Sequence, residues 1–145
     1  MKIIDQLQED KNGLSCELFP PKEGGQLANA LDIVRTISQQ GVDFISVTYG
    51  AGGTSTGKTV AIAEAAEKCG VPAMAHVTCV NAEDAAIEAM LDQLQAAGIQ
   101  NVLALRGDLL PGMELTHEKY QHASDLAQKI KSYGDFCVGG ACYPE

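Results

Sequence analysis

The sequence predicts an α/β fold in which five parallel strands alternate with four helices. Two observations support this prediction. Apolar, β-rich runs of strand length recur along the chain, and helical patterns separate them. Strands that are apolar throughout are typical of a sheet buried on both faces, and parallel strands need a crossover helix between them. The alternation therefore favours a parallel sheet covered by helices.

The expected strands are short runs bounded by turn signals. The first covers residues 14–19, and each of the others follows a glycine. The four glycine-led runs are VDFISVTY after Gly41, VPAMAHVTC after Gly70, IQNVLALRGD after Gly98 and DFCVGGACY after Gly134. Glycine just past a helix can adopt the left-handed conformation that ends the helix. We therefore expect all four glycines to act as helix stops.

Four segments show helical periodicity. They are residues 27–40, 60–69, 82–97 and 117–133. The third has the clearest apolar face, because Ile87, Met90, Leu91 and Leu94 have the i, i+3, i+4, i+7 spacing. Asn81 can cap this helix, and Asp84 adds a favourable charge to its first turn.

Two architectures satisfy the alternation, namely an open doubly wound sheet and a segment of a (β/α)₈ barrel. Periodicity does not separate them. The chain has 145 residues, which predicts a single domain over residues 1–145, whereas a full barrel typically needs ~250 residues. In both architectures, ligands bind at the carboxyl ends of the strands.

Composition excludes several classes of function. Ten basic against nineteen acidic residues give a net charge of −9, which argues against nucleic acid as a partner. No apolar run approaches the ~20 residues of a membrane helix, and the first ten residues do not resemble a signal peptide. Five cysteines without a CxxC pair suggest neither a metal site nor a disulfide framework. We expect a soluble cytoplasmic protein whose cysteines are reduced and mostly buried.

One short motif suggests nucleotide binding. Gly52-x-x-x-x-Gly57-Lys58-Thr59 satisfies the phosphate-loop pattern, follows an apolar run and precedes a helical segment. In such a loop the lysine contacts the outer phosphates and the threonine hydroxyl binds Mg²⁺. A P-loop ATPase is therefore one alternative.

Polar residues close the expected strands. They are Glu17, Thr48, Tyr49, His76, Thr78, Arg106, Asp108, Tyr143 and Glu145. A carboxylate in an apolar strand is costly unless paired or protonated, so Glu17 suits either a general acid or a buried hydrogen-bonded glutamate. Taken alone, His76 is better explained as a hydrogen-bonded histidine of the core than as a functional residue. Arg106-Gly107-Asp108 fits either an ordinary turn or a phosphate contact followed by a ligand-facing carboxylate.

Five of these segments, in this order and spacing, resemble methylenetetrahydrofolate reductase. They are SCELFPPK, FISVTYGAGGTS, AHVTC, NVLALRGD and CYPE. The resemblance covers the chain from Ser15 onward and implies a partial (β/α)₈ TIM barrel. It also implies a flavoprotein of one-carbon metabolism and methionine biosynthesis. Such an oxidoreductase passes hydride from NADH or NADPH through FAD to 5,10-methylenetetrahydrofolate and gives 5-methyltetrahydrofolate.

The resemblance also implies roles for individual residues. Glu17 matches the general acid that opens the methylene bridge of the folate. Asp108 matches a catalytic carboxylate beside the flavin and the pterin, and Thr48 matches a nicotinamide contact. The positions that match FAD contacts are Tyr49, Ala51, His76, Arg106, Gly107, Ala123 and Tyr143, and Arg106 suits the phosphates. His122 departs from the family, which usually has tyrosine there.

In the family, the Gly52–Thr59 segment is the loop after the second strand, so we expect the phosphate-loop match to be accidental and Lys58 to be solvated. The family pattern also continues beyond the residue matched by Glu145. Three hypotheses follow. The chain is a partial reductase with little activity alone, or it forms a homo-oligomer whose sheets pair edge to edge. In the third, it is a folate- or flavin-binding module completed by another chain.

Overall fold

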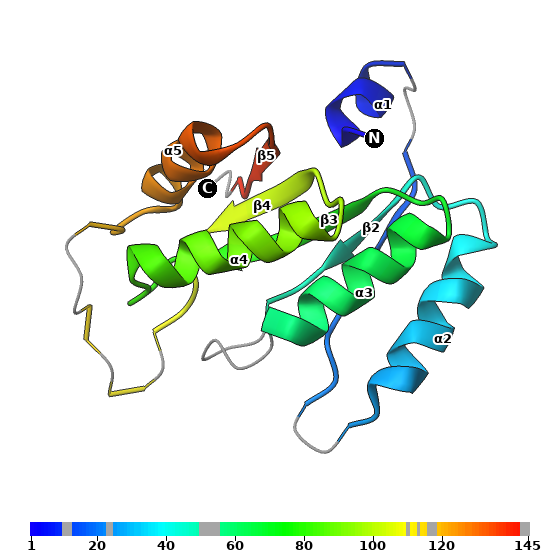
Figure 1. Ribbon diagram of the computed structural model, residues 1–145, viewed down its shortest axis with the longest axis horizontal. Helices are drawn as coiled ribbons and strands as arrows, with labels where there is room; N and C mark the ends of the chain where they lie inside the picture. The colour runs from blue at the N-terminus through cyan, green and yellow to red at the C-terminus, as the bar shows by residue number, and fades with distance from the viewer. Residues whose placement is uncertain are drawn as a thin grey trace.

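A computed structural model describes residues 1–9, 13–22, 25–49, 56–109, 111–112, 114–115 and 119–142 (Figure 1). Its strands are β1 (Ser15–Leu18), β2 (Phe44–Val47), β3 (Ala73–Thr78), β4 (Asn101–Leu105) and β5 (Cys137–Gly140). Its helices are α1 (Ile3–Glu9), α2 (Leu27–Ser38), α3 (Thr56–Lys68), α4 (Asp84–Ala96) and α5 (Ala123–Tyr133). The five strands and the four helices between them confirm the predicted alternation. Helix α1 was not predicted.

The order of the strands separates the two architectures that the sequence left open. The sheet runs β1-β2-β3-β4-β5, and all four neighbouring pairs are parallel. A doubly wound sheet reverses its order at a switch point, and this sheet does not. Because crossovers are right-handed, an unreversed order puts all crossover helices on one face. Figure 1 shows α3 and α4 along the same face of the sheet. The fold is a (β/α)-barrel segment.

The core lies between this face of the sheet and the helices. Its fully buried members from β2, β3 and β4 are Ile45, Val47, Ala73, Ala75, Val102 and Ala104. Helices α3, α4 and α5 contribute Ile62, Leu91, Leu94, Leu126 and Ile130. The predicted apolar face of α4 is confirmed, since Ile87 and Met90 are also buried. Among the described parts of the chain, no helix is long and apolar enough to span a membrane.

The opposite face of the sheet, which we call the inner face, is less well covered. Strand alternation and register assign Glu17, Ser46, Met74, His76 and Leu103 to it. Ser46 and His76 are buried, whereas Met74 and Leu103 are half-buried and Glu17 is exposed. The expectation of a sheet buried on both faces is therefore wrong for the described residues. The inner face is open to a ligand or to further strands.

Three of the four expected helix stops are confirmed. Gly41, Gly70 and Gly98 have φ angles of 76°, 81° and 75°. Gly134 instead has a φ of −166°, which is extended backbone, because the chain passes from α5 directly into the approach to β5. A Cβ at Gly134 would meet the side-chain amide of Gln95.

The cap expected at Asn81 is wrong. Helix α4 begins at Asp84, and Glu83 occupies the N-cap position. Asn81 has a φ of 51°, and its Nδ2 donates to the carbonyl oxygen of Glu114, 3.0 Å away. Asp84 is in the first turn as expected, but its carboxylate also accepts hydrogen bonds from Lys119 and Tyr120.

The five cysteines are free, but most are not buried. Cys79 is buried, whereas Cys16 and Cys137 are intermediate and Cys69 and Cys142 are exposed. The expectation of mostly buried cysteines is therefore wrong. Burial raises the pKa of the Cys79 thiol, which favours its neutral form.

Helix α1 is attached to the amino-terminal end of the sheet through one buried amide. Asn101 in β4 is 1% exposed. Its Oδ1 accepts from the Ile3 backbone nitrogen at 2.7 Å, and its Nδ2 donates to the carbonyl oxygens of Met1 and Ala73 at 3.0 and 3.2 Å. A buried amide with several partners fixes the position of the segment that it binds.

Asn101→Ala is expected to lower the free energy of unfolding by about 2 kcal/mol, because it leaves buried backbone groups without partners. Amide hydrogens of α1 should also exchange faster. Urea unfolding and hydrogen exchange measure the two effects. The matched control is Asn29→Ala on the exposed surface of α2, with an expected change within about 0.5 kcal/mol. Equal effects of the two variants would contradict the role of Asn101.

Candidate active site

Most of the sequence-predicted site residues that the structure describes lie in or just after neighbouring parallel strands. Glu17 lies in β1 and His76 in β3. Thr48 and Tyr49 follow β2, Arg106 to Asp108 follow β4, and Ala123 is the first residue of α5. Ala51 and Tyr143 lie outside the described residues. The carboxyl ends of the strands therefore gather most of the described candidates at one edge of the sheet.

The inner face brings three polar side chains together. His76 Nε2 lies 2.6 Å from Ser46 Oγ and 3.7 Å from Glu17 Oε2. Glu17 is directly in register with Ser46, so the three groups come from three adjacent strands. The structure thus unites Glu17 and His76, which were expected separately. It adds Ser46, which the sequence analysis missed.

Glu17 differs from its expected environment. Its side chain is 50% exposed, so the alternative of a buried, hydrogen-bonded glutamate is wrong. The reason is that Glu17 is on the inner face, while its neighbours Cys16 and Leu18 pack against the core. An exposed carboxyl needs no internal partner, and it is accessible to a ligand that binds over the inner face.

His76 combines the two readings that the sequence left open. It is 6% exposed and hydrogen-bonded, as expected for a core histidine, yet it lies beside the candidate acid. Burial lowers the pKa of His76, while the negative charge of Glu17 acts in the opposite direction. The net effect favours a neutral imidazole, whose Nε2 can donate or accept according to the tautomer.

The lowered pKa of His76 has a consequence for stability. Because the unfolded chain binds this proton more readily, stability should fall as the pH falls below about 6.5 and level off below the lowered folded pKa. The contribution is at most about 1.4 kcal/mol per pH unit. Urea unfolding between pH 4 and 8 measures it. His76→Gln should make this part of the profile flatter, and an unchanged slope would contradict the assignment.

The segment after β4 is hydrogen-bonded to the segment after β3. The carbonyl oxygen of Arg106 accepts from the backbone nitrogens of Cys79 and Val80 at 3.1 and 2.7 Å. Gly107 follows with a φ of +87°, and a Cβ there would lie 2.8 Å from Val80 Cγ1. This turn leaves the Arg106 and Asp108 side chains exposed at the strand ends. A glycine is required because two loops approach closely.

Hydrogen bonds fix the position of Thr48 and of the start of α5, where Ala123 lies. The Thr48 nitrogen donates to the carbonyl oxygen of Leu18 at 3.0 Å, which places Thr48 beside the end of β1. The start of α5 is fixed by Asp125, whose Oδ2 accepts from the His122 nitrogen at 2.9 Å. His122 thus supports the position of Ala123 through its backbone.

The described part of the phosphate-loop motif makes contacts that do not suit nucleotide binding. Thr59 is fully buried, and its hydroxyl donates to the Thr48 carbonyl oxygen at 3.1 Å. Lys58 Nζ donates to the carbonyl oxygens of Pro21 and Lys22 at 2.8 and 3.3 Å. Lys58 is therefore bound to the segment after β1 and is not simply solvated, which corrects the expectation. The Lys58 amine and the Thr59 hydroxyl, which would bind phosphate and Mg²⁺ in a phosphate loop, therefore donate to carbonyl oxygens of the chain instead.

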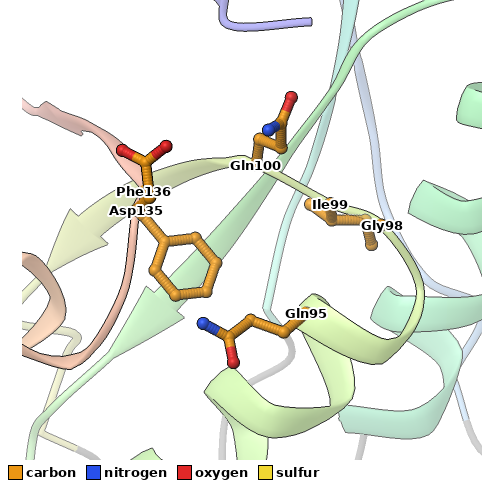
Figure 2. Close-up of a pocket in the computed structure, with 6 residues that line it drawn as sticks. All are labelled: Gln95, Gly98, Ile99, Gln100, Asp135 and Phe136. Atoms are coloured by element: carbon orange, nitrogen blue, oxygen red, sulfur yellow. The ribbon is translucent and has the colours of Figure 1, made fainter.

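A pocket of about 250 Å³ lies elsewhere (Figure 2). It is lined by Gln95, Gly98, Ile99, Gln100, Asp135 and Phe136. These residues end α4 or precede β4 and β5, so the pocket is at the amino-terminal end of the sheet. Ligand sites of parallel β/α folds lie at the other end. This pocket is therefore separate from the candidate site.

The fold and the site define a class of protein. The chain is a parallel β/α-barrel segment with ionisable side chains on its inner face and at the carboxyl ends of its strands. The family model described as methylenetetrahydrofolate reductase matches residues 2–145. The chain belongs to the methylenetetrahydrofolate reductase family, which confirms the resemblance.

Curated relatives agree with this assignment. Methylenetetrahydrofolate reductase 2 of Schizosaccharomyces pombe is 37% identical over 100% of this chain and 24% of its own length. Methylenetetrahydrofolate reductase (NADH) 1 of Arabidopsis thaliana is 35% identical over 100% and 26%. The 5,10-methylenetetrahydrofolate reductase of Escherichia coli is 32% identical over 91% and 44%. The chain thus spans 24% to 44% of the length of these relatives. The roles of its site residues stay predictions.

Proposed function

We propose that this chain contributes the acid and flavin-binding side of a reductase site that converts 5,10-methylenetetrahydrofolate to 5-methyltetrahydrofolate in the cytoplasm. The observation that supports the proposal most strongly is the cluster on the inner face. A half-exposed carboxyl group, Glu17, lies beside the buried Ser46 and His76. An accessible carboxyl in a fixed setting is what general acid catalysis requires.

The proposed role of Glu17 is proton transfer to the folate. Opening the methylene bridge breaks a carbon–nitrogen bond, and the departing nitrogen needs a proton. The carboxyl group supplies that proton, and the resulting iminium carbon then accepts hydride. Asp108, whose carboxyl group is exposed after β4, would stabilise the positive charge of the iminium if it faces the same ligand.

The chemistry of the described residues fits FAD. Arg106 is exposed at the end of β4, and a guanidinium pairs well with phosphate oxygens. Thr48, Tyr49 and His76 contribute further polar groups near the adjacent strand ends. Bound FAD would supply the hydride transfer between nicotinamide and folate.

Gly107 has no side chain to contact FAD, and the space that a Cβ would take there is occupied by Val80 and Thr78. We propose that Gly107 holds the turn that presents Arg106.

The nicotinamide co-substrate is also proposed. The name of the Arabidopsis relative specifies NADH, and that of a Caenorhabditis elegans relative specifies NADPH. Both dinucleotides should therefore be compared.

The reductive half of the reaction tests the flavin proposal. The protein is incubated with FAD, separated from unbound flavin and mixed with NADH or NADPH without oxygen. The expected result is retained visible absorbance that bleaches with at least one dinucleotide. A protein that retains no flavin would contradict the proposed flavin site.

We also propose that strands outside the described residues complete the sheet. Within the described part of the chain, β1 pairs with β2 and β5 pairs with β4, so each has one unpaired edge. Further residues of the same protein, a second copy or another chain could supply the missing strands. Sedimentation of the flavin-loaded protein tests whether a second copy supplies them. A strictly monomeric protein at high concentration would exclude the second copy.

A further inference from the structure

We propose that Ser46 and His76 form a positioning pair that holds the Glu17 carboxyl group in both of its protonation states. This inference rests on the proposed function, in which Glu17 loses and regains a proton in each turnover. It gives Ser46 a role and gives His76 a role in addition to its predicted contact with FAD.

The geometry gives the pair a fixed position beneath the acid. Ser46 and His76 are each 6% exposed, whereas the Glu17 side chain is half exposed. Ser46 Oγ is 2.6 Å from His76 Nε2, which is a hydrogen bond in either direction. Glu17 Oε2 lies 3.7 Å from the same nitrogen. One imidazole nitrogen therefore faces both the serine and the acid.

The state of that nitrogen should depend on the state of the acid. When Glu17 is ionised, a proton on Nε2 is favoured because N–H is attracted to the carboxylate, and Ser46 accepts from it. When Glu17 is protonated, Nε2 can instead be the acceptor, and the Ser46 hydroxyl or the carboxyl proton can point toward it. A change of tautomer, in which the ring loses its proton at Nε2 and takes one up at Nδ1, thus gives the carboxyl group a complementary partner before and after proton transfer.

Burial explains why the imidazole would not simply remove the proton from the acid. A buried imidazolium is unfavourable, and burial lowers the pKa of His76 despite the charge of Glu17. The proton therefore does not settle on the imidazole. The ring orients the acid and does not replace it.

A positioning pair can be distinguished by experiment from a histidine and a serine that only form a structural hydrogen bond in the core. A purely structural pair would keep one tautomer while Glu17 titrates, and its loss would change stability alone. A positioning pair would change tautomer with Glu17, and its loss would slow the proton-transfer step selectively.

Nitrogen NMR of the ¹⁵N-histidine-labelled protein is the first test, and it needs neither flavin nor substrate. The His76 Nε2 signal of the unmodified protein is expected to follow the titration of Glu17, and Glu17→Gln should abolish this response. Ser46→Ala should weaken the response, and Ser46→Thr, which keeps the hydroxyl group, should restore it. The matched control is Ser132→Ala, whose hydroxyl donates to the carbonyl oxygen of Lys129 within α5. An unchanged response in Ser46→Ala would overturn the proposal.

Kinetics provide the second test. Ser46→Ala is expected to slow folate reduction about 10-fold, a part of the usual contribution of a general acid. Reduction of the flavin by the dinucleotide should change by less than about twofold, since that half-reaction does not use Glu17. Equal slowing of both half-reactions would overturn the positioning role. A normal NMR response in a protein that never reduces folate would instead contradict the proposed function.

Discussion

Glu17→Gln is expected to slow the oxidation of the reduced flavin by 5,10-methylenetetrahydrofolate about 1,000-fold, within the range that a general acid contributes. Glutamine keeps the shape of the side chain but has no acidic proton to give. The change should leave stability nearly unaltered, because the Glu17 side chain is half exposed and exposed positions tolerate substitution. The loss should therefore be one of chemistry and not of folding.

Rapid mixing under anaerobic conditions measures the two half-reactions separately. Flavin reduction by the dinucleotide should remain within about twofold of the unmodified protein, because Glu17 acts only on the folate. The matched control is Glu64→Gln on α3, where the carboxylate pairs with Lys68 at 2.7 Å and is remote from the inner face. A Glu17→Gln protein that reduces folate at the normal rate would show that another group protonates the substrate.

Gly107→Ala is expected to lower the free energy of unfolding by about 3 kcal/mol. Two effects add in this estimate. A φ of +87° is unfavourable for any side chain with a Cβ, and the new methyl group would lie 2.8 Å from Val80 Cγ1 and 3.1 Å from Thr78 Cβ. The displaced turn should also weaken FAD binding, because it carries Arg106 and Asp108.

Gly112→Ala measures the cost of a positive φ separately from the steric clash that Gly107→Ala adds. Gly112 has nearly the same φ, +85°, but nothing lies within 4 Å of the position that its Cβ would occupy. Its expected cost is about 1 kcal/mol. Urea unfolding of the two variants compares them directly. Equal destabilisation would mean that the close approach of the loops after β3 and β4 contributes nothing.

Much of the fold could be predicted because local patterns determine it. The apolar spacing in α4 and the glycines at residues 41, 70 and 98 were sufficient to locate helices, stops and the strands between them. Periodicity alone could not predict the order of the strands, since the order depends on which strands pair across the sheet, and it was the family resemblance that implied a barrel segment. Helix α1 was missed for a related reason. It is attached by Asn101, which is nearly a hundred residues away in sequence.

The sequence predicted which strand ends carry the site residues, but it predicted less well how their side chains lie relative to one another. Glu17 and His76 stood out because each interrupts an apolar run. Ser46 also interrupts one, in FISV, and strand alternation would put it on the same face as Thr48. This signal could have identified it. The exposure of Glu17 could not be predicted, because a strand pattern does not show what covers each face of the sheet.

We propose that Glu17 and its neighbours protonate a folate while a bound flavin is oxidised. The most direct measurement begins with the flavin-loaded protein, reduced by NADH or NADPH and freed of excess dinucleotide. This protein is mixed without oxygen with 5,10-methylenetetrahydrofolate, and flavin absorbance and folate products are followed together. Flavin absorbance is expected to return as one 5-methyltetrahydrofolate forms per flavin oxidised. A bound flavin that stays reduced in saturating folate would contradict the proposed function.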